Sequence, residues 1–374
     1  MRSTAALEPG SGAPPVTSRN AGTVWNVFDA DSHASTPQLH LEAPDDLPLP
    51  DRFTMEHWQY LYGSGKFAQL PFRLAPFPPL AHKVSDLADQ LVAWNIVDPS
   101  TGELAEDAEG LLTDLTRDYS HAVFGQVTFP EEAFVREFDF PAEAEHWGLP
   151  KKQLIIPQVP FLITVCDNGR VTSAVSTASA LSINTSTCDA SDVPAGCFAR
   201  EILHILDPDG LRGPRNIPSF RIPRSAAEAF GADPVLGRRR AAGEKIDEKE
   251  LDEAIMRVAR ETGVPRSTVA VLAQMNKAPV AAQMSVVAAR ATATGEDISM
   301  GSAVEVWLLG GADRGMAAKG PARDQGGNLM VQYCPATSSD LTQLIKALFE
   351  ETSVDETALP EDLRKAWHRP FTLG

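Results

Sequence analysis

The side chains best suited to covalent chemistry in this sequence are four cysteines and eight histidines. A thiol enzyme needs a cysteine whose proton a neighbouring histidine can accept. Cys197 and His204 share one predicted helix, yet their spacing places them two turns, or roughly 10 Å, apart, which is too far for proton transfer. We therefore expect His204 to be a partly buried residue with satisfied hydrogen bonds rather than a catalytic base.

The cysteines also lack the spacing of a zinc site or a disulfide scaffold. They are Cys166, Cys188, Cys197 and Cys334. In a large acidic chain without a Cys-x-x-Cys pair, this pattern is typical of buried, reduced thiols. No two histidines stand at metal-ligand spacing, so we expect neither a metal nor a cofactor.

One glycine-rich segment, Gly63–Phe67, resembles a phosphate-binding loop. However, Tyr60 stands where the first glycine belongs, and Phe67 replaces the Ser or Thr that would reach a magnesium ion. We expect this segment to be a turn that ends a helix, and Gly310–Gly315 to be a loop of a sheet. The sequence contains no metalloprotease, nucleophile-elbow or dinucleotide-binding motif. A non-enzymatic protein is therefore the favoured interpretation.

Composition sets the general class of the protein. The chain has 374 residues, 43% of them apolar, with a formal net charge of -17. A chain of this size can bury a large core, and its acidity argues against nucleic acids and anionic membranes as partners. The longest apolar run, Leu154–Val165, is short for a membrane span and contains two prolines. The first residues lack the apolar stretch of a signal peptide, so we expect a cytoplasmic protein without membrane insertion.

Hydrophobic periodicity in the first half of the chain predicts both helices and strands. Apolar residues at helical spacing predict helices over 54–62, 84–94, 104–115 and 198–206. β-Branched and aromatic residues predict strands at Val123–Phe129, Phe134–Phe140, Phe161–Val165 and Val171–Thr177. The Asp167–Gly169 turn joins the last two as a hairpin, so the sheet should be antiparallel.

The second half repeats this order. Helices are predicted over 247–263 and 269–275, strands at Met284–Ala289, Val304–Leu309 and Asn328–Tyr333, and a closing helix at Leu341–Phe349. Each half thus contains two helices, then antiparallel strands, then a closing helix. This recurrence predicts an internal pseudo-repeat. We expect an α+β fold in which the two halves share one sheet and helices cover it.

Composition further divides the chain into five segments. We expect a mobile Pro/Gly-rich arm, a first α/β half, a linker, a second α/β half and an acidic irregular tail. These are residues 1–50, 51–230, 231–246, 247–350 and 351–374.

Several stretches of the chain resemble a known family. They are Phe53–Trp58, Leu87–Asp98, Phe161–Val171 with its Asp-Asn-Gly-Arg-Val hairpin, and Gly327–Phe349. Together they resemble the EspG family of type VII (ESX) secretion chaperones from mycobacteria and their actinobacterial relatives. The resemblance covers about residues 50–350 and consists of a succession of elements without a catalytic fingerprint.

This resemblance implies a quasi-two-fold fold with a central antiparallel β-sheet flanked by α-helical bundles. It also implies a cytoplasmic, non-enzymatic protein that binds the apolar helical tip of a PPE-type protein within a PE-PPE heterodimer. Such a chaperone keeps its cargo soluble for export. The arm before Phe53 and the tail after Glu350 are additions to the usual family core.

A partner-binding loop is expected over 141–160, between the second and third predicted strands. The segment is long for a link between antiparallel neighbours, and it mixes acidic residues with large apolar ones. The expected binding residues are Trp147, Leu149, Leu154, Ile155 and Ile156. Members of the resembled family grip their cargo with the corresponding loop. The alternative is that 154–156 simply begins the third strand and belongs to the core.

Two other functions stay open at the level of the sequence. One is an acyl-transfer or hydrolytic enzyme with an unrecognised Cys or Ser site. The other is a protein-interaction module unrelated to secretion. An unusually acidic cysteine would favour the enzyme, because a low thiol pKa needs a dedicated electropositive setting.

Overall fold

The computed structural model describes residues 53–74, 83–137, 152–177, 181–188, 194–236, 247–292, 295–299, 302–311 and 314–351. The described helices are α1 Met55–Gly63, α2 Val84–Ala93, α3 Glu106–Asp114, α4 Pro194–Leu206, α5 Arg224–Ala232, α7 Glu248–Thr262, α8 Arg266–Lys277 and α9 Ser338–Glu350. Short 3-10 helices are η1 Phe72–Leu74 and η2 Pro130–Glu132. The strands are β1 His121–Thr128, β2 Phe134–Glu137, β3 Lys152–Ile155, β4 Gln158–Val165, β5 Arg170–Ser176, β6 Leu181–Thr187, β7 Phe220–Pro223, β8 Val280–Thr292, β9 Gly295–Ile298, β10 Val304–Leu309, β11 Gly315–Arg323 and β12 Leu329–Pro335.

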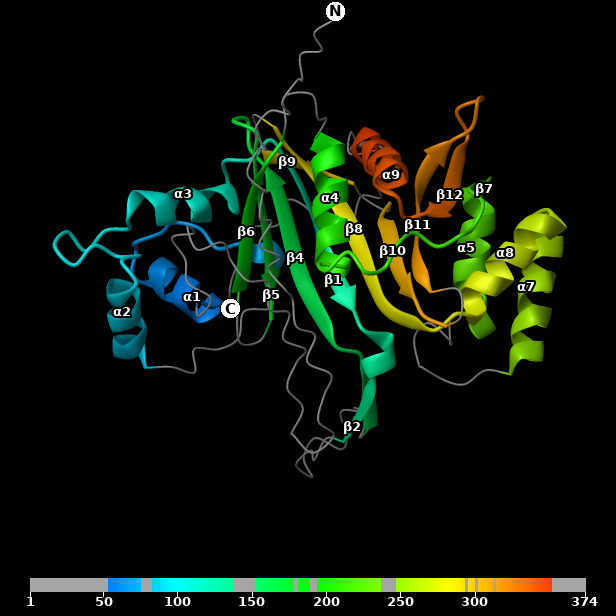
Figure 1. The fold of residues 1–374 in the computed structure, drawn as a ribbon, viewed down its shortest axis with the longest axis horizontal. Helices are drawn as coiled ribbons and strands as arrows, with labels where there is room; N and C mark the ends of the chain where they lie inside the picture. The colour runs from blue at the N-terminus through cyan, green and yellow to red at the C-terminus, as the bar shows by residue number, and fades with distance from the viewer. Residues whose placement is uncertain are drawn as a thin grey trace, which may run out of the picture.

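One large antiparallel sheet runs through the molecule (Figure 1). Its order is β6-β5-β4-β1-β8-β10-β11-β12-β7, and β9 pairs with β8 off this path. The two central strands, β1 and β8, pair so that Phe124 lies opposite Val287. From this central pair the first half extends outward through β4, β5 and β6, and the second half through β10, β11 and β12. The predicted α+β class and quasi-two-fold repeat are therefore confirmed.

The two closing helices, α4 and α9, lie side by side over one face of the sheet (Figure 1). Their apolar faces and the facing strand residues form one continuous core, in which the rings of Phe198 and Phe349 stack 5.6 Å apart. Ile202 and Ile345 are fully buried in it. The helical register predicted from apolar spacing is thus correct for both closing helices.

The remaining helices form two separate groups on the opposite face of the sheet. Helices α1, α2 and α3 pack over the first half around Trp58, while α5, α7 and α8 pack over the second half around Trp307. Figure 1 shows these groups at the two ends of the sheet, with the central strands between them. β8 reflects this asymmetry over residues 281–288, where residues on its α4–α9 face are buried and those on the other face are half-exposed. We call that second surface the open face.

The second predicted strand does not belong to the main sheet. β2 pairs with β3 as a separate two-stranded hairpin, with Phe134 opposite Ile155. The 3-10 turn η2, which begins at Pro130, ends β1 before β2 can continue it. Figure 1 shows β2 projecting beyond the end of the sheet.

Several strands carry no clear sequence signal and were not predicted: β3, β6, β7, β9 and β11. β6 consists mostly of Ser, Thr and Asn, and β11 contains Gly320 and Pro321 although it lies inside the sheet. Gly315 opens β11, so part of the expected loop Gly310–Gly315 is strand. Helix α5 was also missed. With β7 it packs on the second half, because β7 pairs with β12.

The expectation of four reduced cysteines is wrong for two of them. Cys188, just after β6, and Cys197, in the first turn of α4, form a disulfide with their Cα atoms 6.0 Å apart. The end of β6 thus lies next to the start of α4, which allows the pairing without a Cys-x-x-Cys spacing. Cys166 and Cys334 are free and buried, as expected.

The expected arm 1–50 lies outside the described residues, as do 237–246 of the expected linker and all but the first residue of the expected tail. Within the described ranges, no helix combines the length and apolar composition needed to cross a bilayer. The same ranges hold no cluster of three or more His, Cys, Asp or Glu side chains arranged to bind a metal ion.

Candidate functional site

The open face of the sheet carries a groove of about 660 Å³ that runs from the central strands to α5 of the second helical group. Apolar side chains form its floor, with Phe124 and Val287 from the central strands and Pro321 and Val331 from β11 and β12. We call this the sheet groove. The strands position these residues, because every second side chain of a strand faces the same side. The alternate residues, such as Val123 and Val286, fill the core beneath α4 and α9.

Ion pairs line the side of the sheet groove nearest the second helical group. The Lys319 ammonium lies 2.8 Å from a Glu305 carboxylate oxygen and 5.4 Å from the centre of the Trp307 ring. On α5, Arg224 and Glu228 form a second pair at 3.1 Å. These pairs neutralise one another, so the rim is polar without a strong net charge. An apolar floor within such a rim is typical of a protein-binding surface.

Phe124, which lines the groove on β1, is itself contacted by Arg73 of η1. Its guanidinium lies 4.4 Å from the centre of the Phe124 ring and donates a hydrogen bond of 2.6 Å to the Tyr119 hydroxyl. The hydrogen bond to Tyr119 holds the Arg73 guanidinium, and the guanidinium in turn packs on the Phe124 ring and restricts its position. Both halves of the molecule therefore contribute to the groove, with Phe124 from the first half and Val287, Pro321 and Val331 from the second.

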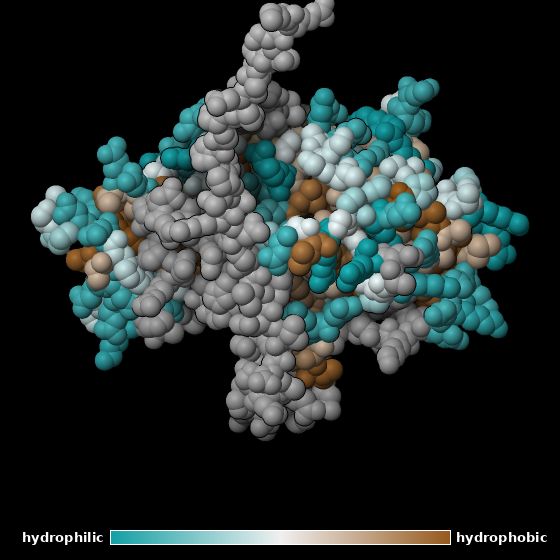
Figure 2. Space-filling view, viewed as in Figure 1, coloured by the Kyte–Doolittle hydropathy of each residue, from teal (hydrophilic) through white to brown (hydrophobic). Residues whose placement is uncertain are grey.

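Polar residues extend the open face from the sheet groove toward the β2–β3 hairpin. Gln126 of β1 and Gln158 of β4 are exposed, and Ser285 of β8 is half-exposed. Beyond the ends of β1 and β4, the hairpin begins. Its strand β2 presents two large apolar side chains, Phe134 and Val135, that are 41% and 60% exposed. Figure 2 shows hydrophobic surface at the position of β2.

Three of the five predicted binding residues fall in or directly after this hairpin. Trp147 and Leu149 lie outside the described residues. Leu154 and Ile155 belong to β3 and pair with Val135 and Phe134, while Ile156 follows directly. Ile155 and Ile156 are half-buried. The described part of the 141–160 segment is thus largely strand, but 154–156 does not begin the third predicted strand: Leu154 and Ile155 end β3, which lies outside the main sheet, and β4 starts at Gln158.

Sequence reasoning missed Phe134 and Val135 as surface residues and missed the sheet groove entirely. Both omissions have one cause, since a strand's alternation shows two faces but not what covers each face. The Pro130 break after β1 was the available signal for the hairpin. Nothing comparable marks Val287 as a groove residue, because its neighbours on β8 are equally apolar.

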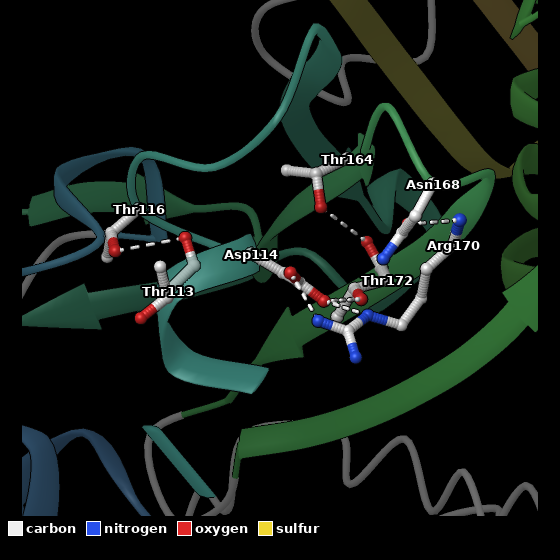
Figure 3. Close-up of polar contacts among 7 residues, drawn as sticks. All are labelled: Thr113, Asp114, Thr116, Thr164, Asn168, Arg170 and Thr172. Atoms are coloured by element: carbon white, nitrogen blue, oxygen red, sulfur yellow. Dashed lines mark hydrogen bonds and ion pairs between the residues drawn. The ribbon is translucent and has the colours of Figure 1, made fainter. Parts of the chain in front are cut away.

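A polar cluster in the first half bears on the enzyme alternative (Figure 3). Asp114, buried at the end of α3, accepts hydrogen bonds from the Arg170 guanidinium at 2.6 Å and the Thr172 hydroxyl at 3.2 Å. Burial, with the nearby Asp114 carboxylate, raises the pKa of the Cys166 thiol to about 12. Burial also raises the pKa of Cys334 to about 12. A nucleophilic cysteine requires the opposite shift.

The same polar cluster has a structural role, which accounts for the arginine directly after the Asp167–Gly169 turn. Arg170 follows the Asp167–Gly169 turn and returns to α3, so it ties the hairpin of β4 and β5 to the helix that precedes β1. Its pKa is raised, chiefly by the hydrogen bond to Asp114. The arrangement is that of a structural ion pair.

No protein-family model and no curated protein matches this chain. Comparison with solved structures finds the Mycobacterium tuberculosis type VII secretion system chaperone EspG5, in a structure of its complex with a PE25–PPE41 dimer. The match has a TM-score of 0.53 at 14% sequence identity and covers 80% of this chain and 95% of that one. The chain therefore has an EspG-like fold, as the sequence resemblance implied.

Proposed function

We propose that this protein is a type VII secretion chaperone that binds the helical tip of a PPE-type cargo, within a PE-PPE heterodimer, and keeps it soluble for export. The observation that carries the proposal is the EspG-like fold, since the matched EspG5 structure is a complex with a PE25–PPE41 dimer. On this proposal the protein acts in the cytoplasm and catalyses no reaction.

The open face has the chemistry that such a cargo needs. A helical tip presents apolar side chains on an element about 10–12 Å wide. The sheet groove offers an apolar floor bordered by ion pairs, and the β2–β3 hairpin adds exposed apolar side chains at Phe134 and Val135. Large apolar anchors inside a polar border supply most of the binding energy in protein interfaces. Binding would cover these side chains on both partners and so prevent aggregation.

The test is co-purification of tagged full-length protein with a PPE-type cargo encoded in the same genome. Two double variants probe the hairpin: Trp147→Asp with Leu149→Asp, and Phe134→Asp with Val135→Asp. Each should abolish cargo capture because it places charges in an apolar contact. The melting temperature should change little for the second pair, since both side chains are already exposed.

Leu211→Asp is the matched control. Leu211 is 81% exposed in the loop after α4 and contributes to neither the hairpin nor the sheet groove. Its variant should capture cargo as the unmodified protein does. Undiminished capture by the two folded hairpin variants would remove the hairpin from the proposal. Failure of the unmodified protein to bind any PPE-type cargo would remove the proposal itself.

A further inference from the structure

The chain leaves its last described helix at the edge of the sheet groove. Glu351, which follows α9, lines the groove and accepts a hydrogen bond from the Ser302 hydroxyl. Residues 352–374 continue from this point and lie outside the described residues. A segment of this length, tethered at the rim, needs no long reach to enter the groove.

The sequence of that segment suits the groove. Leu359, Leu363 and Trp367 are spaced i, i+4, i+8, which is the pattern of one apolar helix face. Pro360 stands at the start of this pattern, where proline is tolerated in a helix. Acidic residues come first and basic residues last, the order that a helix dipole favours.

Charge also fits. The basic part of the segment carries Arg364, Lys365 and Arg369. On the groove rim the Glu228 carboxylate, whose side chain is 67% exposed, is accessible to a second cation. The apolar floor at Phe124 and Val287 matches the apolar stripe.

We propose that residues 352–374 dock in the sheet groove as an intramolecular ligand that competes with cargo. The docking itself follows from the groove and the tether, while the competition rests on the proposed function. A tethered segment acts at an effective concentration of about 1 mM, so even a weak contact keeps the groove occupied until a stronger ligand arrives.

The experiment uses the full chain and a fluorescein-labelled peptide of residues 352–374, followed by fluorescence anisotropy. The released-tail variant carries Leu363→Asp and Trp367→Asp. It should bind the peptide saturably, whereas the unmodified chain, whose own segment competes, should bind it at least about tenfold more weakly. A control with Thr357→Asp and Thr372→Asp adds the same charge off the apolar stripe and should behave as the unmodified chain.

A second substitution locates the site. Val287→Lys, added to the released-tail variant, should abolish peptide binding, and Leu211→Lys in the same background should not. No saturable binding to the released-tail variant at about 1 mM peptide would overturn the inference. So would binding that survives Val287→Lys in a folded protein.

The two proposals fail separately. Peptide binding without capture of any PPE-type cargo would leave the docked segment standing and remove the chaperone function. Cargo capture that is equal for the unmodified chain and the released-tail variant, despite peptide binding, would overturn the competition. If both proposals hold, the released-tail variant captures cargo more tightly than the unmodified chain.

Discussion

At the scale of single residues, Asp114 shows how a buried charge can connect elements. Its carboxylate is almost inaccessible, yet its partner Arg170 keeps 41% of its side-chain surface in solvent. The ion pair is thus only partly desolvated, and its contribution to stability is smaller than that of a fully buried pair. The Thr172 hydroxyl supplies the further hydrogen bond that a buried carboxylate needs.

We expect Asp114→Asn to lower the free energy of unfolding by about 2 kcal/mol, because it weakens charged hydrogen bonds in a buried position. Urea denaturation measures the change. Asp118→Asn is the control, since Asp118 pairs with Arg117 at 3.7 Å on the surface and should matter by less than about 0.5 kcal/mol. Equal effects of the two substitutions would refute a structural role for the Asp114 pair.

The two free thiols give a pH-dependent prediction. The pKa of Cys166 and of Cys334 is raised from 9.0 to about 12 in the folded protein, so the folded state holds these protons more tightly than the unfolded state does. Their contribution to stability is therefore complete below pH 9 and is lost as the pH rises toward 12. By pH 10 the loss should be about 1 kcal/mol per thiol.

Urea midpoints at pH 8 and pH 10 measure this loss. A variant with Cys166→Ala and Cys334→Ala should be less stable at pH 8, because it loses buried volume, but should lose less stability between the two pH values. Parallel pH profiles for the two proteins would contradict the raised thiol pKa values.

At the scale of elements, α9 is the clearest case of sequence deciding structure. The Thr337 hydroxyl accepts a hydrogen bond of 3.0 Å from the Asp340 amide and so caps the helix. Leu341, Ile345 and Leu348 then place one apolar stripe on the sheet. Residues on the opposite side of the helix, such as Gln343, are exposed.

Ile345→Asp should therefore destabilise the protein by several kcal/mol, since it buries an unpaired charge between α9 and the sheet. The equivalent change in the first half, Ile202→Asp, should have a similar effect on α4. Thermal melts compare both with Gln343→Asp, which alters an exposed position of α9 and should melt near the unmodified protein. A cooperative, undiminished melt for Ile345→Asp would contradict the packing of α9.

The elements also show where prediction from sequence succeeds and fails. Helices α4, α7 and α9 were predictable because periodic apolar residues and a clear end define them. β11 was not, since Gly320 lies where α9 comes so close that a side chain would touch Leu344. There the packing of a distant helix, rather than strand propensity, selects the residue.

The candidate site shows the same division. The long insertion between two predicted strands was visible in sequence, and the structure places Leu154 and Ile155 of that insertion in the β2–β3 hairpin; their role in binding stays a prediction. The sheet groove was not visible, since it depends on which part of the open face the helices leave uncovered. Phe124 becomes a groove residue only through the position of Arg73, which is distant in sequence.

At the scale of the whole molecule, the contact between halves is the β1–β8 pair. Gly125 lies at its centre, opposite Val286. A Cβ atom at this position would collide with the backbone oxygen of Ser285 on β8. Glycine is thus required for the two halves to approach this closely.

Gly125→Ala should destabilise the protein by about 2 kcal/mol or more, because the strands must separate or bend to admit the methyl group. Calorimetry should show a lower melting temperature and, if the halves separate, a broader transition. Gly231→Ala in α5 is the control: no atom lies within 4 Å of its added Cβ, and alanine favours a helix. A neutral Gly125→Ala would show that the central pair tolerates wider spacing.

The central position of β1 has a consequence for synthesis on the ribosome. β1 finds one neighbour, β4, soon after it emerges, but Thr128 and Gln283 of its other neighbour are 155 residues apart. At roughly 5–20 residues per second, the nascent first half waits about 8–30 s with one edge of β1 unpaired. During that interval the edge can pair with another chain. The protein that we propose to protect an aggregation-prone cargo thus passes through an exposed stage of its own, and slower translation of 129–282 should lower its soluble yield.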